Sequence, residues 1–135
     1  MGAAADDPVR QGQLLRTALD DHVRLAIKTG AVRRHLKHRM IEIDDLIKQH
    51  LPEGSTFAYA ENVLRSAGFD IGPRPAADVL HRFAGSEYEF DVEAYLGCGR
   101  KRFEGGQCIV ALRPKRPYDY SQVHRILTSC GFLSL

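Results

Sequence analysis

Residues 87–96 read Glu-Tyr-Glu-Phe-Asp-Val-Glu-Ala-Tyr-Leu, and this stretch decides the fold class. Apolar residues alternate with acids at a period of two, which is typical of a β-strand with one buried and one solvated face. Before Pro75 the pattern is different, because apolar residues recur every three or four positions, as they do on one face of a helix. The change of period near Pro75 therefore predicts helices first and strands afterwards.

Two further apolar stretches flank this strand. Residues 78–83 precede it and residues 107–113 follow it, and we expect both to be strands. The Gly- and Arg-rich segment 97–106 between the last two strands is expected to be a hairpin loop. Residues 121–131 leave two alternatives open, a helix closed by Gly131 or a last edge strand.

Three helices are expected in the first half of the chain. The first covers residues 8–29, where two acids and a proline open an apolar stripe that ends at a glycine. The second covers 31–51, because apolar residues keep their helical spacing until Pro52; it is one helix, or two pieces with Asp44 capping the second. The third covers 55–67, between a Ser-Thr cap and a Gly-Phe ending.

The composition is that of a globular protein of ordinary domain size. The chain has 135 residues, of which 44% are apolar and 27% are charged. We therefore predict a single α+β domain over residues 1–135, in which two to three N-terminal helices pack on one face of a small antiparallel β-sheet and residues 1–7 are flexible. No apolar run approaches the roughly 18 residues that a membrane span needs, so we expect no membrane span.

The first residues, Met-Gly-Ala-Ala-Ala-Asp-Asp, lack the basic and apolar regions of a signal peptide. A run of small residues followed by acids is typical of a mature chain whose signal has been removed and replaced by a start Met. This interpretation places the protein in the periplasm or outside the cell. The alternative is the true start of a cytoplasmic protein.

Charge is unevenly distributed although the net charge is only +2. Residues 52–96 carry three basic and eight acidic side chains, whereas residues 97–135 carry seven basic and two acidic ones. Such asymmetry can steer a charged partner. A candidate surface for an anionic partner is formed by Arg33, Arg34, Lys37, Arg100, Lys101, Arg102, Lys115 and Arg116. A nucleic acid is one such partner, but the pI of about 8.5 and the acidic strand make a protein partner the preferred prediction.

Signatures of catalysis and of metal binding are missing from the sequence. There is no Gly-x-Ser-x-Gly elbow and no Cys–His signature, so we predict that the protein is not an enzyme. His35 and His38 lie one helical turn apart, but basic residues surround them and no third ligand follows at a specific spacing, so we expect no metal and no cofactor.

A family resemblance rests on residues 44–113. Asp45-Leu46-Ile47, then Leu51-Pro52-Glu53-Gly54-Ser55-Thr56, Val63-Leu64 and Gly68-Phe69, followed by a meander of strands, resemble small bacterial envelope proteins of the SmpA/OmlA lipoprotein type. The chain differs from that type in its extra helix at the front and in having no lipidation Cys near its start. The resemblance implies a non-enzymatic binding role in the periplasm.

Three cysteines complete the candidate sites. Cys98 and Cys108 flank the expected hairpin loop, and if the two strands pair they could approach the separation that a disulfide needs. Cys130 is then expected to be free and packed in the core. In the cytoplasm, all three would stay reduced.

From these observations we predict a small non-enzymatic bacterial envelope or secreted protein that acts as a surface binding module. The alternative is a cytosolic nucleic-acid-binding domain that uses the basic patches at 33–39 and 100–116.

Overall fold

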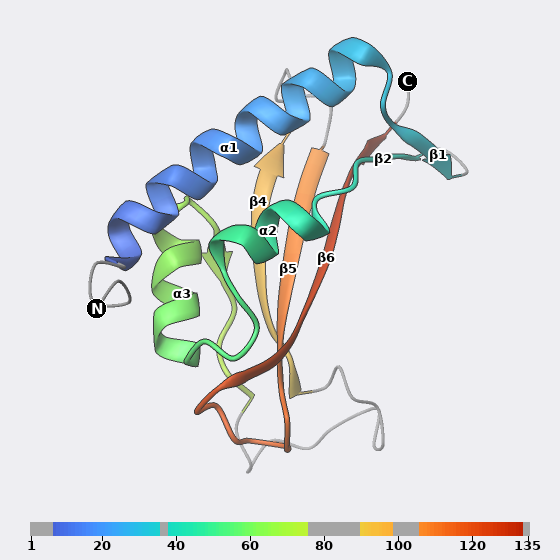
Figure 1. Cartoon of the computed structure of the whole chain (residues 1–135). Coiled ribbons are helices and arrows are strands. Elements are labelled where there is room, and N and C mark those ends of the chain that lie inside the picture. The colour runs from blue at the N-terminus through green and yellow to red at the C-terminus, as the bar shows by residue number, and fades with distance from the viewer. Residues whose placement is uncertain (1–6, 36–37, 76–89, 99–105, 134–135) are drawn as a thin grey trace.

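The structure is a computed structural model that describes residues 7–35, 38–75, 90–98 and 106–133 (Figure 1). In these residues the elements are α1 (Pro8–Thr29), β1 (Arg33–His35), β2 (His38–Met40), α2 (Asp44–His50), α3 (Phe57–Ser66), β3 (Asp70–Ile71), β4 (Val92–Cys98), β5 (Gly106–Pro114) and β6 (Val123–Leu133).

The described strands form one antiparallel sheet in the order β1-β2-β6-β5-β4-β3. Alternate residues of β5 are buried, namely Cys108, Val110 and Leu112. They belong to a single buried cluster that also contains the apolar stripes of α1 and α3. The helices therefore pack on one face of the sheet, and the predicted α+β class is confirmed.

The first and third predicted helices are confirmed, and local chemistry explains their ends. The Asp7 carboxylate accepts a hydrogen bond from the Val9 N–H at 3.0 Å, and Gly30 closes α1 in the left-handed conformation at φ 77°. At α3 the Thr56 hydroxyl oxygen accepts from the Tyr59 N–H at 3.1 Å. Both helices thus begin at a side-chain cap that the sequence displays.

Gly12 lets α1 and α3 approach each other at backbone distance. A Cβ atom at Gly12 would lie 2.4 Å from the Val63 carbonyl oxygen and 2.5 Å from Cβ of Ser66. One turn later the Arg16 guanidinium donates to the Ala67 carbonyl at 2.9 Å, which holds the end of α3 against α1.

The predicted helix over 31–51 is wrong for most of its length. Among the described residues of this range only α2 is helical. Residues 33–35 and 38–40 form instead the paired strands of the β1–β2 hairpin, which extends the sheet beyond β6. The apolar spacing that suggested a helix also contains a period of two, since Ile41 and Ile43 are both buried. Pairing with β6 decides between the two periods, and the Ile41 N–H donates to the Cys130 carbonyl at 2.8 Å.

The strand predictions fare better where the structure describes them. Residues 107–113 lie within β5, and the predicted strand 87–96 is observed from Val92, extended to Cys98. The ambiguous segment 121–131 lies mostly in a strand, β6, which pairs with β5 along its length and buries Ile126 and Cys130 in the core. The predicted strand 78–83 and most of the predicted loop 97–106 lie outside the described residues. No helix of the described part is long and apolar enough to cross a membrane.

Candidate functional site

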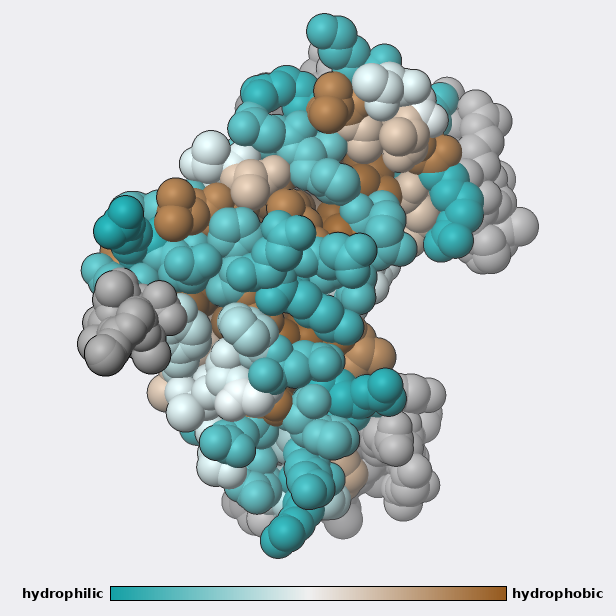
Figure 2. All heavy atoms as spheres, in the orientation of Figure 1, coloured by the Kyte–Doolittle hydropathy of each residue, from teal (hydrophilic) through white to brown (hydrophobic). Residues whose placement is uncertain are grey.

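Three adjoining hollows surround Glu42, which lines all of them. Their volumes are about 530, 250 and 460 Å³. Together we call them the Glu42 groove, which is lined by residues 30–33, 40–45 and 128–130 with His22, Leu25, Ala26 and Thr29. Figure 2 shows apolar residues gathering in the upper part of this face, where α1 meets the β1–β2 hairpin, and a hollow in the outline below them.

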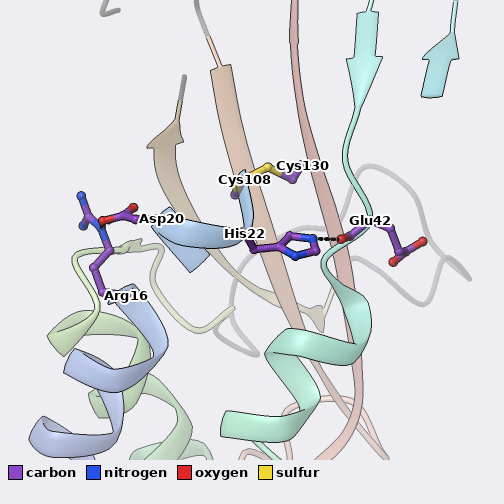
Figure 3. Close-up of a disulfide and its surroundings, with 6 residues drawn as sticks. All are labelled: Arg16, Asp20, His22, Glu42, Cys108 and Cys130. Carbon is purple, nitrogen blue, oxygen red and sulfur yellow. Dashed lines mark hydrogen bonds and ion pairs between the residues drawn. A yellow bond between two sulfur atoms is a disulfide. The ribbon is translucent and has the colours of Figure 1, made fainter. Parts of the chain in front are cut away.

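The groove exists because the chain leaves the sheet after β2. Residues 41–43 turn away from β6 toward α2, and the hairpin stays attached to the end of α1 through the turn at Gly30. The His22 imidazole on α1 lies with its Nε2 2.6 Å from the Glu42 carbonyl oxygen, which fixes this turn against the helix (Figure 3). The side chain of Glu42 points away from His22.

One part of the groove is apolar. Leu25 stands 60% exposed on α1 at its rim, although most large apolar side chains of the described residues are buried. Below it Ile41 and Ile43 are buried in the floor, and Val32 and Met40 line the side formed by the hairpin. Such a surface can take an apolar side chain of a ligand.

The other part of the groove is acidic. Glu42, Asp44 and Asp45 line it together with Thr128 of β6. The Asp44 carboxylate accepts from the Thr128 hydroxyl at 3.2 Å and lies 3.1 Å from the Lys48 ammonium. The hydrogen bond that the Lys48 ammonium donates to Asp44 is the main reason why the pKa of Lys48 is raised above its usual value. Asp44 is therefore held by its neighbours. Glu42 and Asp45 are exposed, and one carboxylate oxygen of Glu42 accepts from the Asp44 N–H at 3.0 Å.

A disulfide lies beneath the groove and corrects the predicted pairing. Cys108 of β5 is bonded to Cys130 of β6, with a Cα–Cα distance of 4.0 Å, and Cys130 lines the largest hollow (Figure 3). The register explains the error, since Cys108 faces Cys130 on one side and Leu96 on the other, while Cys98 faces Gly106. The predicted Cys98–Cys108 bridge and the predicted free Cys130 are both wrong.

The predicted basic surface is not brought together in the described residues. Arg33 lines the groove, whereas Lys115 and Arg116 are exposed in the turn after β5, at the other end of the sheet. The strand β6 runs between these ends, and its residues from 123 to 131 span about 25 Å at 3.3 Å per residue. Arg34 belongs to β1 by its backbone. Lys37, Arg100, Lys101 and Arg102 lie outside the described residues.

A second polar cluster lies at the far end of the sheet, and sequence reasoning missed it. The Arg113 guanidinium donates twice to the buried Asp91 carboxylate, both times at 3.0 Å. Nearby the Tyr120 hydroxyl donates to the Phe90 carbonyl at 2.9 Å, and burial raises the pKa of Tyr120 to about 12. These contacts join the start of β4 to the end of β5, and their partners are too far apart in sequence to leave a local signal.

The same cluster is extended by a cation over aromatic rings. The Arg74 guanidinium lies 5.9 Å from the centre of the Phe57 ring and 5.8 Å from that of Tyr120, and it pairs with the Glu61 carboxylate at 2.8 Å. All of these groups have partners within the protein, so the cluster stabilises the packing of the loops against the sheet.

Neither a metal-binding cluster in the described residues nor a match to a known protein adds another candidate site. Among the described residues, no three His, Cys, Asp or Glu side chains are arranged to hold a metal ion. Comparison of the chain with protein-family models, curated proteins and solved structures finds no match. The resemblance to the SmpA/OmlA type stays a prediction.

Proposed function

We propose that this protein is a non-enzymatic binding module of the cell envelope or the extracellular space, and that the Glu42 groove is its binding surface. The observation that carries the proposal is the groove itself. It is an open concavity of about 530 Å³ whose lining combines aliphatic side chains with a few charged groups. Ligand sites in proteins have this size and this mixture, with the polar groups setting orientation.

The disulfide supports the proposed compartment. Structural disulfides persist in oxidising compartments, whereas cytosolic thiols are kept reduced. The bridge between Cys108 and Cys130 spans 22 positions of sequence, and closing such a loop removes about 3 kcal/mol of unfolded-state entropy. The bridge therefore suits a small domain that must survive outside the cytoplasm.

The rigid frame under the groove supports a binding role. The strands β5 and β6 pair along eight register positions, and the disulfide joins them directly beneath the hollow. Binding residues are commonly carried by connecting segments that a rigid scaffold positions. Residues 41–43 and the hairpin are such segments here.

An amide NMR titration tests the binding role. The ¹⁵N-labelled protein is titrated with a pool of extended peptides and, separately, with a short single-stranded oligonucleotide of dT. We expect the peptides to shift the amides of residues 30–33, 40–45 and 128–130. Shifts caused by the oligonucleotide and centred on Lys115 and Arg116 would favour the nucleic-acid alternative instead.

A disulfide map tests the compartment. Trypsin separates the three cysteines, because the sequence places Cys98 in fragment 83–100, Cys108 in 103–115 and Cys130 in 126–135. Protein taken from its natural source, with thiols blocked at lysis, is digested without reductant. We expect fragments 103–115 and 126–135 to be linked. Finding both cysteines blocked would contradict an oxidising location.

A further inference from the structure

We propose that the Glu42 groove takes an extended peptide in which an apolar segment adjoins a basic one. This inference rests on the proposed function and names the class of ligand. The apolar residues occupy the part lined by Leu25 and Val32, and the basic residues lie against the carboxylates near Thr128. Three features of the groove support this arrangement.

Charge is the first feature. The acidic part is lined by Glu42, Asp44 and Asp45. Two cations lie close to this part, Lys48 beside Asp44 and Arg125, whose charge acts on Lys48. Lys48 is already engaged, since it lies 3.1 Å from Asp44 and 3.8 Å from Glu53.

Glu42 and Asp45 keep their negative charges exposed at this end. Arg33 lies on the opposite side, in the hollow lined by the hairpin. The groove is thus negative at the end near α2, and a basic ligand segment is the complementary one.

The exposed apolar rim is the second feature. Leu25 and Leu14 both stand out from α1, at 60% and 48% exposure, and their spacing of eleven residues places them on the same side of the helix. Only Leu25 lies at the groove, where Ala26, Ala31 and Ile41 continue the apolar surface inward. A ligand side chain that covers Leu25 removes this surface from water.

The edge of β6 is the third feature, and it favours an extended ligand. The Cys130 carbonyl accepts from the Ile41 N–H at 2.8 Å, and four residues earlier the Ile126 N–H donates to the Glu53 carboxylate, also at 2.8 Å. In an antiparallel strand every second residue turns its N–H and C=O to the same edge. Thr128 lies midway between these two positions, so its backbone groups face the groove, where a peptide strand can bond to them.

The test compares two blocked peptides, acetyl-Leu-Leu-Lys-Lys-amide and acetyl-Leu-Leu-Glu-Glu-amide, by amide NMR titration of the whole chain. We expect the basic peptide to shift groove amides and to bind more weakly as salt is added, because exposed charges are screened. Equal affinity of both peptides at the groove would overturn the inference and leave the proposed function standing. If neither peptide shifts a groove amide, both proposals fail.

Matched variants on exposed residues sharpen the test. Leu25→Ser should weaken the basic peptide about tenfold, because the partial burial of one leucine is lost. Asp45→Asn should weaken it about two- to fivefold, as expected for one exposed charge pair. The controls Leu14→Ser on α1 and Asp70→Asn on β3 change the same residue types away from the groove, and affinity should not change. Loss of affinity in the controls, or none in the groove variants, would contradict the assignment.

Discussion

The long strands β4, β5 and β6 and the β1–β2 hairpin belong to one sheet, but they differ in how many backbone positions pair and in how much of their surface is buried. The strands β4, β5 and β6 pair over seven or more positions, and one face of them is buried under α1 and α3. The hairpin strands have three residues each, and β2 meets β6 at three positions only. The long strands therefore supply stability, and the lightly attached hairpin supplies the side of the groove.

The largest expected effect comes from opening the disulfide, which belongs to the long strands. Reducing Cys108–Cys130 should lower the free energy of unfolding by about 3 kcal/mol, because the unfolded chain regains the freedom of the loop. Urea denaturation with and without reductant measures this. Cys98→Ala should keep the sensitivity to reductant, and Cys130→Ala should abolish it. The reverse pattern would mean that Cys98 forms the bridge.

Gly12→Ala should be the next most harmful change. The new Cβ meets the Val63 carbonyl and Ser66 of α3 at under 3.0 Å, so the two helices must separate. We expect a loss of about 2 kcal/mol, with overpacking outweighing the better helix propensity of alanine. Gly97→Ala is the matched control, because nothing lies within 4 Å of a Cβ there. Equal urea midpoints for both variants would show that the helices are not in close contact.

Gly131→Ala should weaken the contact between β6 and the hairpin, because Gly131 lies opposite Met40. Its Cβ would lie 2.6 Å from the Met40 sulfur and 3.0 Å from the Arg39 carbonyl oxygen. We expect β2 to detach, with a loss of about 1 kcal/mol in global stability. Hydrogen exchange should become fast in residues 38–41 and stay slow in β5. Uniformly faster exchange would contradict the claim that the hairpin is attached more weakly than the long strands β4, β5 and β6.

A separate effect, confined to high pH, is a pH dependence carried by Tyr120 at the far end of the sheet. Its pKa is raised to about 12 by burial, above the value of about 10 in an unfolded chain. The unfolded state therefore loses its proton first, and stability should fall as pH rises from about 10 to 12. Tyr120→Phe should flatten this dependence in urea midpoints measured across that range. An unchanged slope would show that another group causes it.

The parts of the fold that could be predicted are those whose signals are local. The helices α1 and α3 display their caps and their apolar stripes within one stretch of sequence, and β5 displays a short unbroken run of apolar residues. The hairpin could not be predicted in this way, because residues 31–43 satisfy two periods and only contact with β6 decides between them. The error in the disulfide has the same origin, since the partner of Cys108 depends on 121–131 being a strand.

The groove was harder still to predict, because three separate segments form it, residues 22–33, 40–45 and 128–130. Arg33 was singled out from the sequence, but for a basic surface that the described residues do not assemble. Glu42 and Asp45 fall within the predicted helix over 31–51, and no motif marked them as site residues. Their place beside Thr128, more than eighty positions later, follows from the antiparallel sheet and from the turn of the chain at residues 41–43.

The central claim is that residues 33–35 and 38–40 are paired strands attached to β6 and thereby create the groove. Backbone chemical shifts and nuclear Overhauser effects test it most directly. The account predicts extended shifts for 33–35 and 38–40, with contacts that link Met40 to Gly131. A continuous run of helical shifts across 31–43, without contacts to β6, would contradict the hairpin and remove the groove with it.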